Sequence, residues 1–234
     1  GFGRRATLSH IVEVAEIAMS IDKPVQLLWS REDDLRHGFY RPAAMMKIKA
    51  TTDEEGRVTA WQARRSGANI TAQTMKNALP GVLPSMPTSL LNGLVGVMDY
   101  VFDNWAVDGS SVEGLHETYS LPSYRVSHAS VDHGLPTTFW RSVGHSYTSF
   151  AVESMMDELA EARQIDPVAL RLKNLEGKPR MQNVVAQAGK LMADMSVPET
   201  HHLGFAAHSS FGTDVAQIAE VSVTNGNIRV HKVT

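Results

Sequence analysis

The sequence predicts an α+β fold with twisted mixed or antiparallel sheets and helices packed on one face. Some segments carry apolar residues at helical spacing, and others alternate apolar and polar residues on either side of turn residues. These helices and strands do not follow the strict βαβ order of a parallel sheet. With 234 residues the chain can form one large domain or two small ones. We expect two subdomains that meet near residues 110–135.

The first quarter of the chain predicts a helix, a strand and a second short helix. Between Thr7 and Ser20, apolar residues recur at i, i+3, i+4 and i+7, which indicates an amphipathic helix. Residues 25–29 form a short apolar run, which we interpret as a buried strand. Ser30 is a suitable N-cap for a helical turn that continues to Arg36.

Alternating segments predict two hairpins and a further strand. Residues 46–50 and 58–61 flank the turn residues 53–56, so we expect their strands to pair. Residues 124–131 alternate like a strand. Residues 215–223 and 228–233 flank Asn225-Gly226, a dipeptide typical of a type I′ turn. This last hairpin is the clearest in the sequence.

The remaining helices lie in the middle and in the second half of the chain. Residues 70–107 are apolar without a clean period and are interrupted by prolines and glycines, so we expect helical turns packed under loops. A helix is predicted over residues 146–163, and Asp166-Pro167 opens another that reaches Leu175. A further helix is predicted over residues 181–192, followed by a linker or surface loop through residues 198–202.

Composition excludes several classes of site and partner. The chain has no cysteine, which excludes disulfides, thiolate zinc sites and iron–sulfur clusters held by this chain. A net charge of -3 and scattered basic residues give no footprint for nucleic acid. No apolar run approaches the ~20 residues that a membrane-spanning helix needs. We therefore expect neither nucleic acid nor a membrane segment, and the compartment, cytoplasmic or periplasmic, stays open.

Several motifs follow one another along nearly the whole chain. They are Gly1-Phe2-Gly3-Arg4-Arg5, Trp29-Ser30-Arg31-Glu32-Asp33-Asp34, Tyr40-Arg41-Pro42-Ala43-Ala44, Phe139-Trp140-Arg141-Ser142-Val143-Gly144-His145-Ser146, Phe150-Ala151-Val152-Glu153-Ser154, Asp166-Pro167, and Gly204-Phe205-Ala206-Ala207-His208-Ser209-Ser210-Phe211-Gly212. In this order and spacing the chain resembles the molybdopterin-binding large subunit of bacterial molybdenum hydroxylases of the xanthine oxidase and aldehyde oxidase family, isoquinoline 1-oxidoreductase beta-subunit type. The resemblance implies that residues 1–234 form part of a molybdopterin-binding domain.

The resemblance assigns cofactor contacts to the amino-terminal loop. Glycines before a helix let backbone N–H groups approach an anion closely, and the helix dipole favours negative charge there. In the family this loop lies against the molybdopterin, so the resemblance implies cofactor contacts for Gly1, Phe2, Gly3 and Arg4. The alternative is a glycine-rich turn that only leads into the helix.

Two further segments complete the expected cofactor contacts. Arg141 offers a planar fork of donors for phosphate, and Ser142 and Gly144 stand beside it. A surface arginine in an ion pair is the alternative. Ser209 and Ser210 offer hydroxyl and amide donors to the dinucleotide part of the cofactor, or lie in a loop before the final hairpin.

Other candidate groups have simpler explanations. The resemblance places Val143 on the substrate funnel, and the alternative is a buried valine. The histidines lack the spacing of a metal site, so we interpret them as surface or polar-core residues. Glu153, Asp157 and Glu158 lie within one helix with no nucleophile nearby, which favours a solvated helix face.

The family's chemistry requires parts that this sequence does not show. In the family a glutamate of a Gly-x-Gly-Glu-Pro-like motif acts as general base; we find no such motif here and assign no catalytic residue. Loss of a general base costs ~10²–10⁴ in rate, so we expect the isolated chain to be inactive. By resemblance, the intact parent oxidises N-heteroaromatic rings or aldehydes with water as the oxygen source.

The resemblance also implies the cofactor and the partners. It implies molybdopterin cytosine dinucleotide as the cofactor of the parent enzyme. It implies a small [2Fe–2S] subunit and the remainder of the large subunit as partners. For the chain alone two outcomes stay open, binding of part of this cofactor and binding of none. One alternative is a truncated, non-enzymatic scaffold or interaction module of this family. Another is a module that binds a substrate with residues 70–107.

Overall fold

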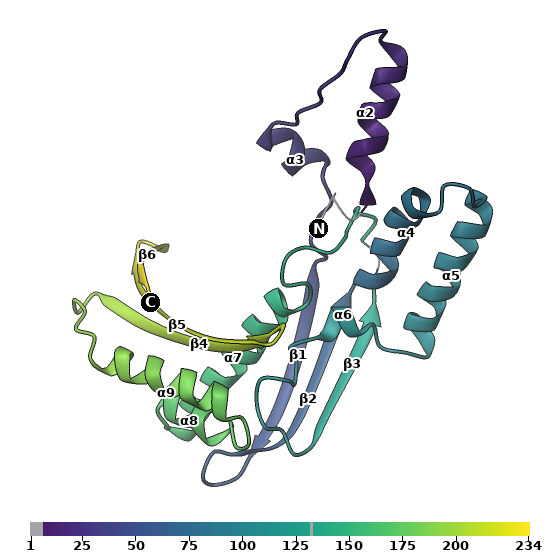
Figure 1. The fold of residues 1–234 in the computed structure, drawn as a ribbon. Coiled ribbons are helices and arrows are strands. Elements are labelled where there is room, and N and C mark those ends of the chain that lie inside the picture. Colours follow the sequence, from purple (N-terminus) through teal and green to yellow (C-terminus); the bar gives the residue numbers. More distant parts are fainter. Residues whose placement is uncertain (1–6, 132) are drawn as a thin grey trace. The chain divides into compact units, whose positions relative to one another are not determined.

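The computed structural model describes residues 7–131 and 133–234, which form two compact units. Unit 1 comprises Gly1–Met45, Arg65–Val112 and Ser127–Gly144, and unit 2 comprises Met46–Arg64, Glu113–Val126 and His145–Thr234. Figure 1 shows helices together with two separate three-stranded sheets. The α+β class predicted from the sequence is confirmed, with mixed and antiparallel sheets.

Unit 1 begins with two helices that the sequence predicts. Helix α2 spans Ser9–Ser20, and no residue on it is buried. Helix α3 spans Arg31–His37, and Ser30 caps it in a capping box with Asp33. The strand predicted at residues 25–29 is not formed: these residues have no ladder partner, and an apolar run needs one to become a strand.

Residues 70–107 form two well-defined helices instead of helical turns under loops. Helix α4 spans Ile70–Val82, α5 spans Thr88–Asn104, and the short α6 spans Gly109–Val112. Buried Asp108 fixes the start of α4, because it accepts hydrogen bonds from the backbone N–H and the hydroxyl of Thr71. One side of α5 is buried through Leu91 and Val95.

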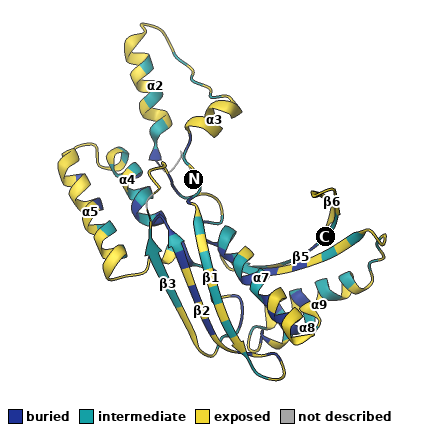
Figure 2. Ribbon diagram, turned by 180° about the vertical axis from the view of Figure 1, so that it is seen from behind, coloured by how far each residue is buried: buried dark blue, intermediate teal, exposed yellow. Residues whose placement is uncertain are grey.

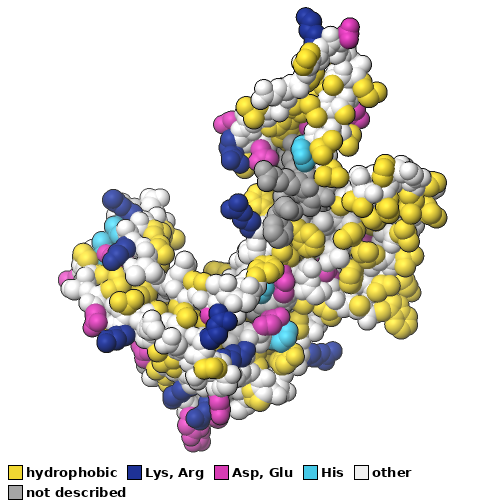
Figure 3. All heavy atoms as spheres, in the orientation of Figure 1, with side chains coloured by type: hydrophobic (Ala, Val, Ile, Leu, Met, Phe, Trp, Pro, Cys, Tyr) yellow, Lys and Arg dark blue, Asp and Glu magenta, His cyan; other side chains and the backbone are white. Residues whose placement is uncertain are grey.

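The other side of α5 is apolar and exposed. Leu90, Leu94, Val97 and Val101 recur along it at helical spacing, and all four are exposed. Figure 3 shows hydrophobic side chains gathered over α4 and α5. The segment between these helices, residues 82–90, borders an open apolar groove of about 510 Å³.

The first sheet contains the hairpin predicted at residues 46–61. Its strands are β1 (Ala44–Thr52), β2 (Val58–Gly67) and β3 (Tyr124–Ser130), hydrogen-bonded in the order β1-β2-β3. Along β1 and β2 the burial alternates, as expected for strands with one covered face. Gly56 occupies the turn with a φ of +88°, a conformation that glycine adopts without strain.

Unit 2 contains three helices and the second sheet. The helices are α7 (His145–Arg163), α8 (Pro167–Lys173) and α9 (Pro179–Ala193), close to the predicted bounds. Asp166 caps α8 by accepting from the backbone N–H of Ala169, as its position before Pro167 predicts. In both ribbon views these helices lie against one face of the second sheet (Figures 1 and 2).

The second sheet is antiparallel, in the order β4-β5-β6. Its strands are β4 (His201–Ser210), β5 (Thr213–Thr224) and β6 (Asn227–Val233). Asn225 and Gly226 both have positive φ in the turn between β5 and β6, so the hairpin predicted there is confirmed. Residues 201–210 form a full strand, because they pair with β5 along their whole length. The linker or surface loop predicted over residues 198–202 therefore overlaps the start of this strand.

The core of unit 2 lies between the helices and β4 and β5. Its fully buried apolar side chains include Met156, Leu170, Leu175, Val185 and Ile218. Figure 2 shows buried residues along α7 and α8. Among the residues that the structure describes, no helix has the length and apolar character to cross a membrane.

Candidate functional site

A strained turn at residues 141–144 carries three of the predicted cofactor-binding residues and the predicted substrate contact. Ser142 and Val143 both have positive φ, 66° and 46°, which is rare for residues other than glycine and unfavourable for a β-branched side chain. The backbone N–H of Val143 donates to the carbonyl oxygen of Trp140 at 3.0 Å. Strain of this kind persists only where the surroundings hold the backbone in place.

Arg41 holds this turn from within unit 1. Its Nη1 donates to the carbonyl oxygen of Val143 at 3.0 Å, and its Nη2 donates to the carbonyl oxygen of Arg141 at 2.9 Å. The guanidinium also lies 5.7 Å from the ring centroid of Trp140, within the range of a cation–π contact. One planar side chain therefore fixes the direction of two carbonyl groups of the turn.

The four residues of the turn differ in exposure. Arg141 is exposed, Ser142 is half-buried, and Val143 and Gly144 are buried. The guanidinium of Arg141 is therefore accessible to an anion, while the side chain of Val143 is 6% exposed. No acidic residue stands in the turn, so nothing in it neutralises Arg141.

The other predicted pair, Ser209 and Ser210, ends strand β4 in unit 2. Both residues are half-buried, and they pair with Asp214 and Thr213 across a tight turn. Phe211 and Gly212 make this turn with φ values of 49° and 75°, as in a type I′ turn. The hairpin thus holds the serines at a fixed position.

Ser209 lines a cavity of about 340 Å³ that also contains basic side chains. Lys178 and Arg180 border it, together with Thr118, Glu117 and Asp214. Burial lowers the pKa of Lys178, and the nearby charges of the two acidic residues oppose this shift. Hydroxyl and cationic donors therefore share one cavity with two carboxylates, and Nε of Arg180 lies 3.6 Å from Oδ2 of Asp214.

A pair of histidines adjoins two of the predicted segments. His145, the first residue of α7, follows Gly144 directly, and His208 precedes Ser209. Their Nδ1 and Nε2 atoms lie 2.9 Å apart, at hydrogen-bond distance. His145 is 9% exposed.

Each histidine of this pair has a further polar neighbour. The backbone N–H of Ser209 donates to Oγ1 of Thr118, which lies 3.2 Å from Nδ1 of His208. A hydroxyl can accept a second hydrogen bond or donate one, so Thr118 suits either tautomer of His208. Nε2 of His145 lies 3.8 Å from the Glu113 carboxylate.

Burial favours the neutral imidazole of His208. It lowers the pKa of His208 to about 4, with a further contribution from His145 and an opposing one from Glu117. Near neutral pH, His208 is therefore uncharged, so one of its ring nitrogens donates and the other accepts.

Glycine at position 114 makes room for the histidine pair. A Cβ atom there would lie 2.5 Å from Oγ1 of Thr148 and 2.8 Å from Nδ1 of His145. Gly114 also has a φ of +89°, which other residues rarely adopt. Both the space and the backbone conformation thus require glycine.

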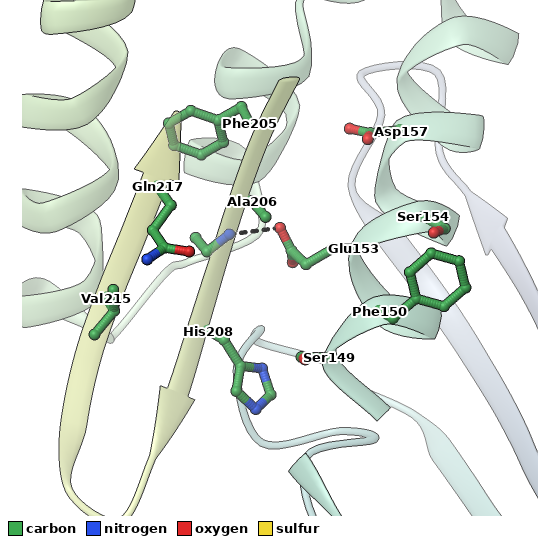
Figure 4. A pocket seen from close by; sticks show the side chains of 11 residues that line it. Ser149, Phe150, Glu153, Ser154, Asp157, Phe205, Ala206, His208, Val215 and Gln217 are labelled. Atoms are coloured by element: carbon green, nitrogen blue, oxygen red, sulfur yellow. Dashed lines mark hydrogen bonds between the residues drawn. The ribbon is translucent and has the colours of Figure 1, made fainter. Parts of the chain in front are cut away.

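A second cavity of unit 2, of about 330 Å³, lies between α7 and the strands β4 and β5 (Figure 4). The side chain of Glu153 reaches across from α7 and accepts a hydrogen bond from the backbone N–H of Ala207 at 2.7 Å. It also accepts from the hydroxyl of Tyr119 at 2.6 Å and from Nε of Arg171 at 2.9 Å. Donors from three elements therefore surround this carboxylate.

The solvated helix face predicted for Glu153 is wrong. The residue is 6% exposed, and its partner Arg171 is fully buried. Burial raises the pKa of Glu153, while the charge of Arg171 and three kinds of hydrogen bond oppose that shift. Asp157, which is largely exposed, accepts a second bond from Arg171 at 2.8 Å. The network is fully paired, which indicates a structural joint between α7, α8 and β4.

The predicted site residues thus fall into three groups. Gly1, Phe2, Gly3 and Arg4 lie outside the described residues. Arg141, Ser142, Val143 and Gly144 share one turn in unit 1, and Ser209 and Ser210 share one strand end in unit 2.

Several residues of the site were not predicted from the sequence. These are Arg41, Thr118, His145, Lys178, Arg180 and His208. Most of their partners are distant in sequence, which hides them from local pattern analysis; only the positions of His145 and His208 beside predicted segments offered a signal.

Comparisons with known proteins give matches over most of the chain. Residues 100–175 match the family model of the molybdopterin cofactor-binding domain. The isoquinoline 1-oxidoreductase subunit beta of Brevundimonas diminuta is 26% identical over 84% of this chain and 22% of its own length. The membrane-bound aldehyde dehydrogenase of Gluconacetobacter polyoxogenes is 26% identical over 77% of this chain and 21% of its own length. The chain therefore spans about a fifth of the length of these relatives.

Solved structures show the same fold. Quinoline 2-oxidoreductase from Pseudomonas putida 86 matches 89% of this chain and 27% of its own, with a TM-score of 0.60 and 15% identity. The aldehyde oxidoreductase from Desulfovibrio gigas matches 94% of this chain and 24% of its own, with a TM-score of 0.53 and 20% identity. Over most of its length the chain is therefore similar to part of these relatives and solved structures, and residues 100–175 match the molybdopterin cofactor-binding domain.

Proposed function

We propose that this chain binds part of the molybdopterin cofactor of a molybdenum-dependent hydroxylase or dehydrogenase. The observation that carries the proposal is the turn at residues 141–144, within the segment that matches the cofactor-binding family. Two consecutive residues with positive φ are held there by Arg41, beside an exposed guanidinium. Backbone strain that is maintained by dedicated contacts is typical of binding and catalytic sites.

The residues present suit an anionic group. Arg141 offers a planar set of donors for phosphate oxygens, and the hydroxyl of Ser142 lies next to it in the turn. In unit 2, Ser209 shares its cavity with Lys178 and Arg180. We propose that both segments contribute donors to the cofactor, together with Gly1, Phe2, Gly3, Arg4, Gly144 and Ser210.

The protein's part in this chemistry is to hold and orient the cofactor. When bound, the cofactor supplies metal-centred oxidation with water as the source of oxygen. Arg141 would hold negative charge, and Arg41 would keep the backbone of the turn in its binding conformation. Val143, buried at the centre of this turn, would form part of the wall that faces the substrate.

The names of the relatives support a proposed substrate class. Their names specify isoquinoline, nicotinate and an aldehyde as substrates of those proteins. We propose that the intact parent of this chain oxidises N-heteroaromatic compounds or aldehydes. We further propose the cytosine dinucleotide form of the cofactor and a small [2Fe–2S] subunit that takes the electrons onward.

The isolated chain is proposed to be inactive. It spans about a fifth of the relatives' length, and the proposal rests on that share. Binding and turnover are therefore separate properties, and binding is the one that this chain can be tested for.

The test compares cofactor retention between two arginine variants. The chain is produced in a bacterium that makes molybdopterin, and the molybdenum, pterin and cytosine nucleotide that co-purify with it are measured. We expect Arg141→Ala to retain about tenfold less pterin than the wild type, because a charge-assisted contact is lost. Arg125→Ala, an exposed arginine on β3, is the matched control and should retain it. Equal retention by both variants, or a wild type that folds without pterin, would leave a scaffold function instead.

A further inference from the structure

Two histidines of unit 2 form a bond that the predicted function does not itself require. His145 and His208 belong to α7 and β4, and they come together through the fold at an Nδ1 to Nε2 distance of 2.9 Å. Their rings meet edge to face, with centroids 5.0 Å apart. Among the described residues, no group of three or more His, Cys, Asp or Glu side chains is arranged to hold a metal ion.

The second ring nitrogen of each histidine lies near a further polar side chain. On one side, Thr118 accepts from the backbone N–H of Ser209 and contacts Nδ1 of His208. On the other side, Nε2 of His145 faces Glu113, whose carbonyl oxygen accepts from the hydroxyl of Thr148. The chain of contacts therefore runs from the main chain of Ser209 to the first turn of α7.

The surroundings are built to keep this pair in place. Thr118 is 1% exposed, and Gly114 leaves the space that a Cβ atom would take from His145. Phe211, next to Ser210, adds an edge contact to the ring of His145 at 5.4 Å between centroids. A loosely held surface histidine would show none of these constraints.

We infer that His145 and His208 are positioning residues, which lock the start of α7 to the end of β4 so that Ser209 keeps its binding geometry. The inference rests on the proposed cofactor-binding function and deepens it. Both histidines act through hydrogen bonds to other residues and need not contact the cofactor.

Two substitutions of His208 distinguish a positioning role from a role in filling space. One substitution keeps the hydrogen bond to His145, and the other loses it. Glutamine at position 208 places an amide where Nε2 of the imidazole lies, so His208→Gln can still donate to His145. His208→Leu fills a similar volume without a donor. His202→Leu is the control, because His202 is an exposed histidine on the same strand.

The experiment uses the whole chain, produced in a bacterium that makes molybdopterin, and has two readouts. The first is the pterin that co-purifies with each variant. We expect about a tenfold loss in His208→Leu, because the site is left mobile and a buried acceptor is unpaired, recovery in His208→Gln, and no change in His202→Leu. The second is nitrogen-15 NMR of the histidines in the wild type, where a coupling across the hydrogen bond between Nδ1 of His145 and Nε2 of His208 should be detected.

The outcomes distinguish this inference from the function on which it rests. If the wild type carries pterin and His208→Leu carries as much, the pair does not position the site, although the proposed function stands. Absence of the coupling between the two rings in the folded wild type would also overturn the inference. If the folded wild type carries no pterin, the proposed function itself fails. If His208→Leu unfolds, two measurements still test the inference. His208→Gln should carry as much pterin as His202→Leu, and the NMR readout tests the hydrogen bond in the wild type.

Discussion

Nδ1 of His145 lies 2.9 Å from Nε2 of His208, although 63 positions separate the two residues in the sequence. Gly144 precedes the first histidine and Ser209 follows the second, and both neighbours are predicted cofactor-binding residues. The fold therefore brings two segments of unit 2 together. Next to each segment, the sequence predicts a residue that binds the same cofactor.

Substitution of Gly114 with alanine should destabilise the chain. The new Cβ would lie 2.5 Å from Oγ1 of Thr148, and the φ of +89° is strained for alanine. We expect a loss of about 1–3 kcal/mol in the free energy of unfolding, measured with urea. Gly204→Ala is the control, since no atom lies within 4 Å of its added Cβ. Equal stability of both variants would contradict the close packing described at Gly114.

Removal of the Arg171 side chain should destabilise unit 2 strongly. Arg171→Met leaves the carboxylate of Glu153 buried without its cationic partner, at a cost of about 3–5 kcal/mol. The double variant Glu153→Gln with Arg171→Met should recover much of this loss, because it removes the unpaired charge. Thermal and urea unfolding of the three proteins measure the difference. A double variant as unstable as the single one would show that the arginine acts by packing alone.

Stability should fall in acid partly because of His208. Its pKa is about 4 in the folded chain and 6.5 in the unfolded chain, so the unfolded chain binds more protons between these values. The contribution of His208 is therefore complete above pH 6.5 and is lost as the pH falls toward about 4. The groups that face it are His145, Thr118 and Glu117.

The variant His208→Gln tests this pH dependence. It should flatten the rise of unfolding free energy with pH in this window, compared with the wild type. His202→Gln should keep the wild-type slope. Identical slopes in the wild type and in His208→Gln would show that His208 titrates alike in both states.

Arg41 should control the order of the turn at residues 141–144. Arg41→Ala removes the donors to the carbonyl groups of Arg141 and Val143, so two residues with positive φ lose their support. We expect faster hydrogen exchange at residues 142–144 and about 1–3 kcal/mol lower stability. Arg41→Lys should not restore the wild-type exchange, because an ammonium cannot reproduce the planar fork. Unchanged exchange in both variants would contradict the role given to Arg41.

Elements that depend on local signals could be predicted from the sequence. Ser30 caps α3 as its side chain and the acidic residue three positions later suggest, and Asn225-Gly226 forms the final turn. Helix α7 begins within one residue of its predicted start, since apolar residues recur along it at helical spacing. In each case the deciding contacts lie within a few positions of one another.

Elements that depend on distant partners could not be predicted. Residues 25–29 are apolar but have no strand to pair with, whereas residues 201–210, rich in small and polar side chains, pair fully with β5. Glu153 resembles a solvated residue until Arg171, 18 positions away, is placed against it. The same holds for the candidate site, because Arg41 supports a turn about 100 positions further along the chain.

The central claim, that this chain holds part of a molybdopterin cofactor, is tested most directly by metal and pterin analysis of the purified wild-type chain. Mass spectrometry for molybdenum and fluorescence of the released pterin should both give a signal that rises in proportion to the protein. A chain that unfolds cooperatively, yet contains neither molybdenum nor pterin after production in a cofactor-making host, would contradict the claim.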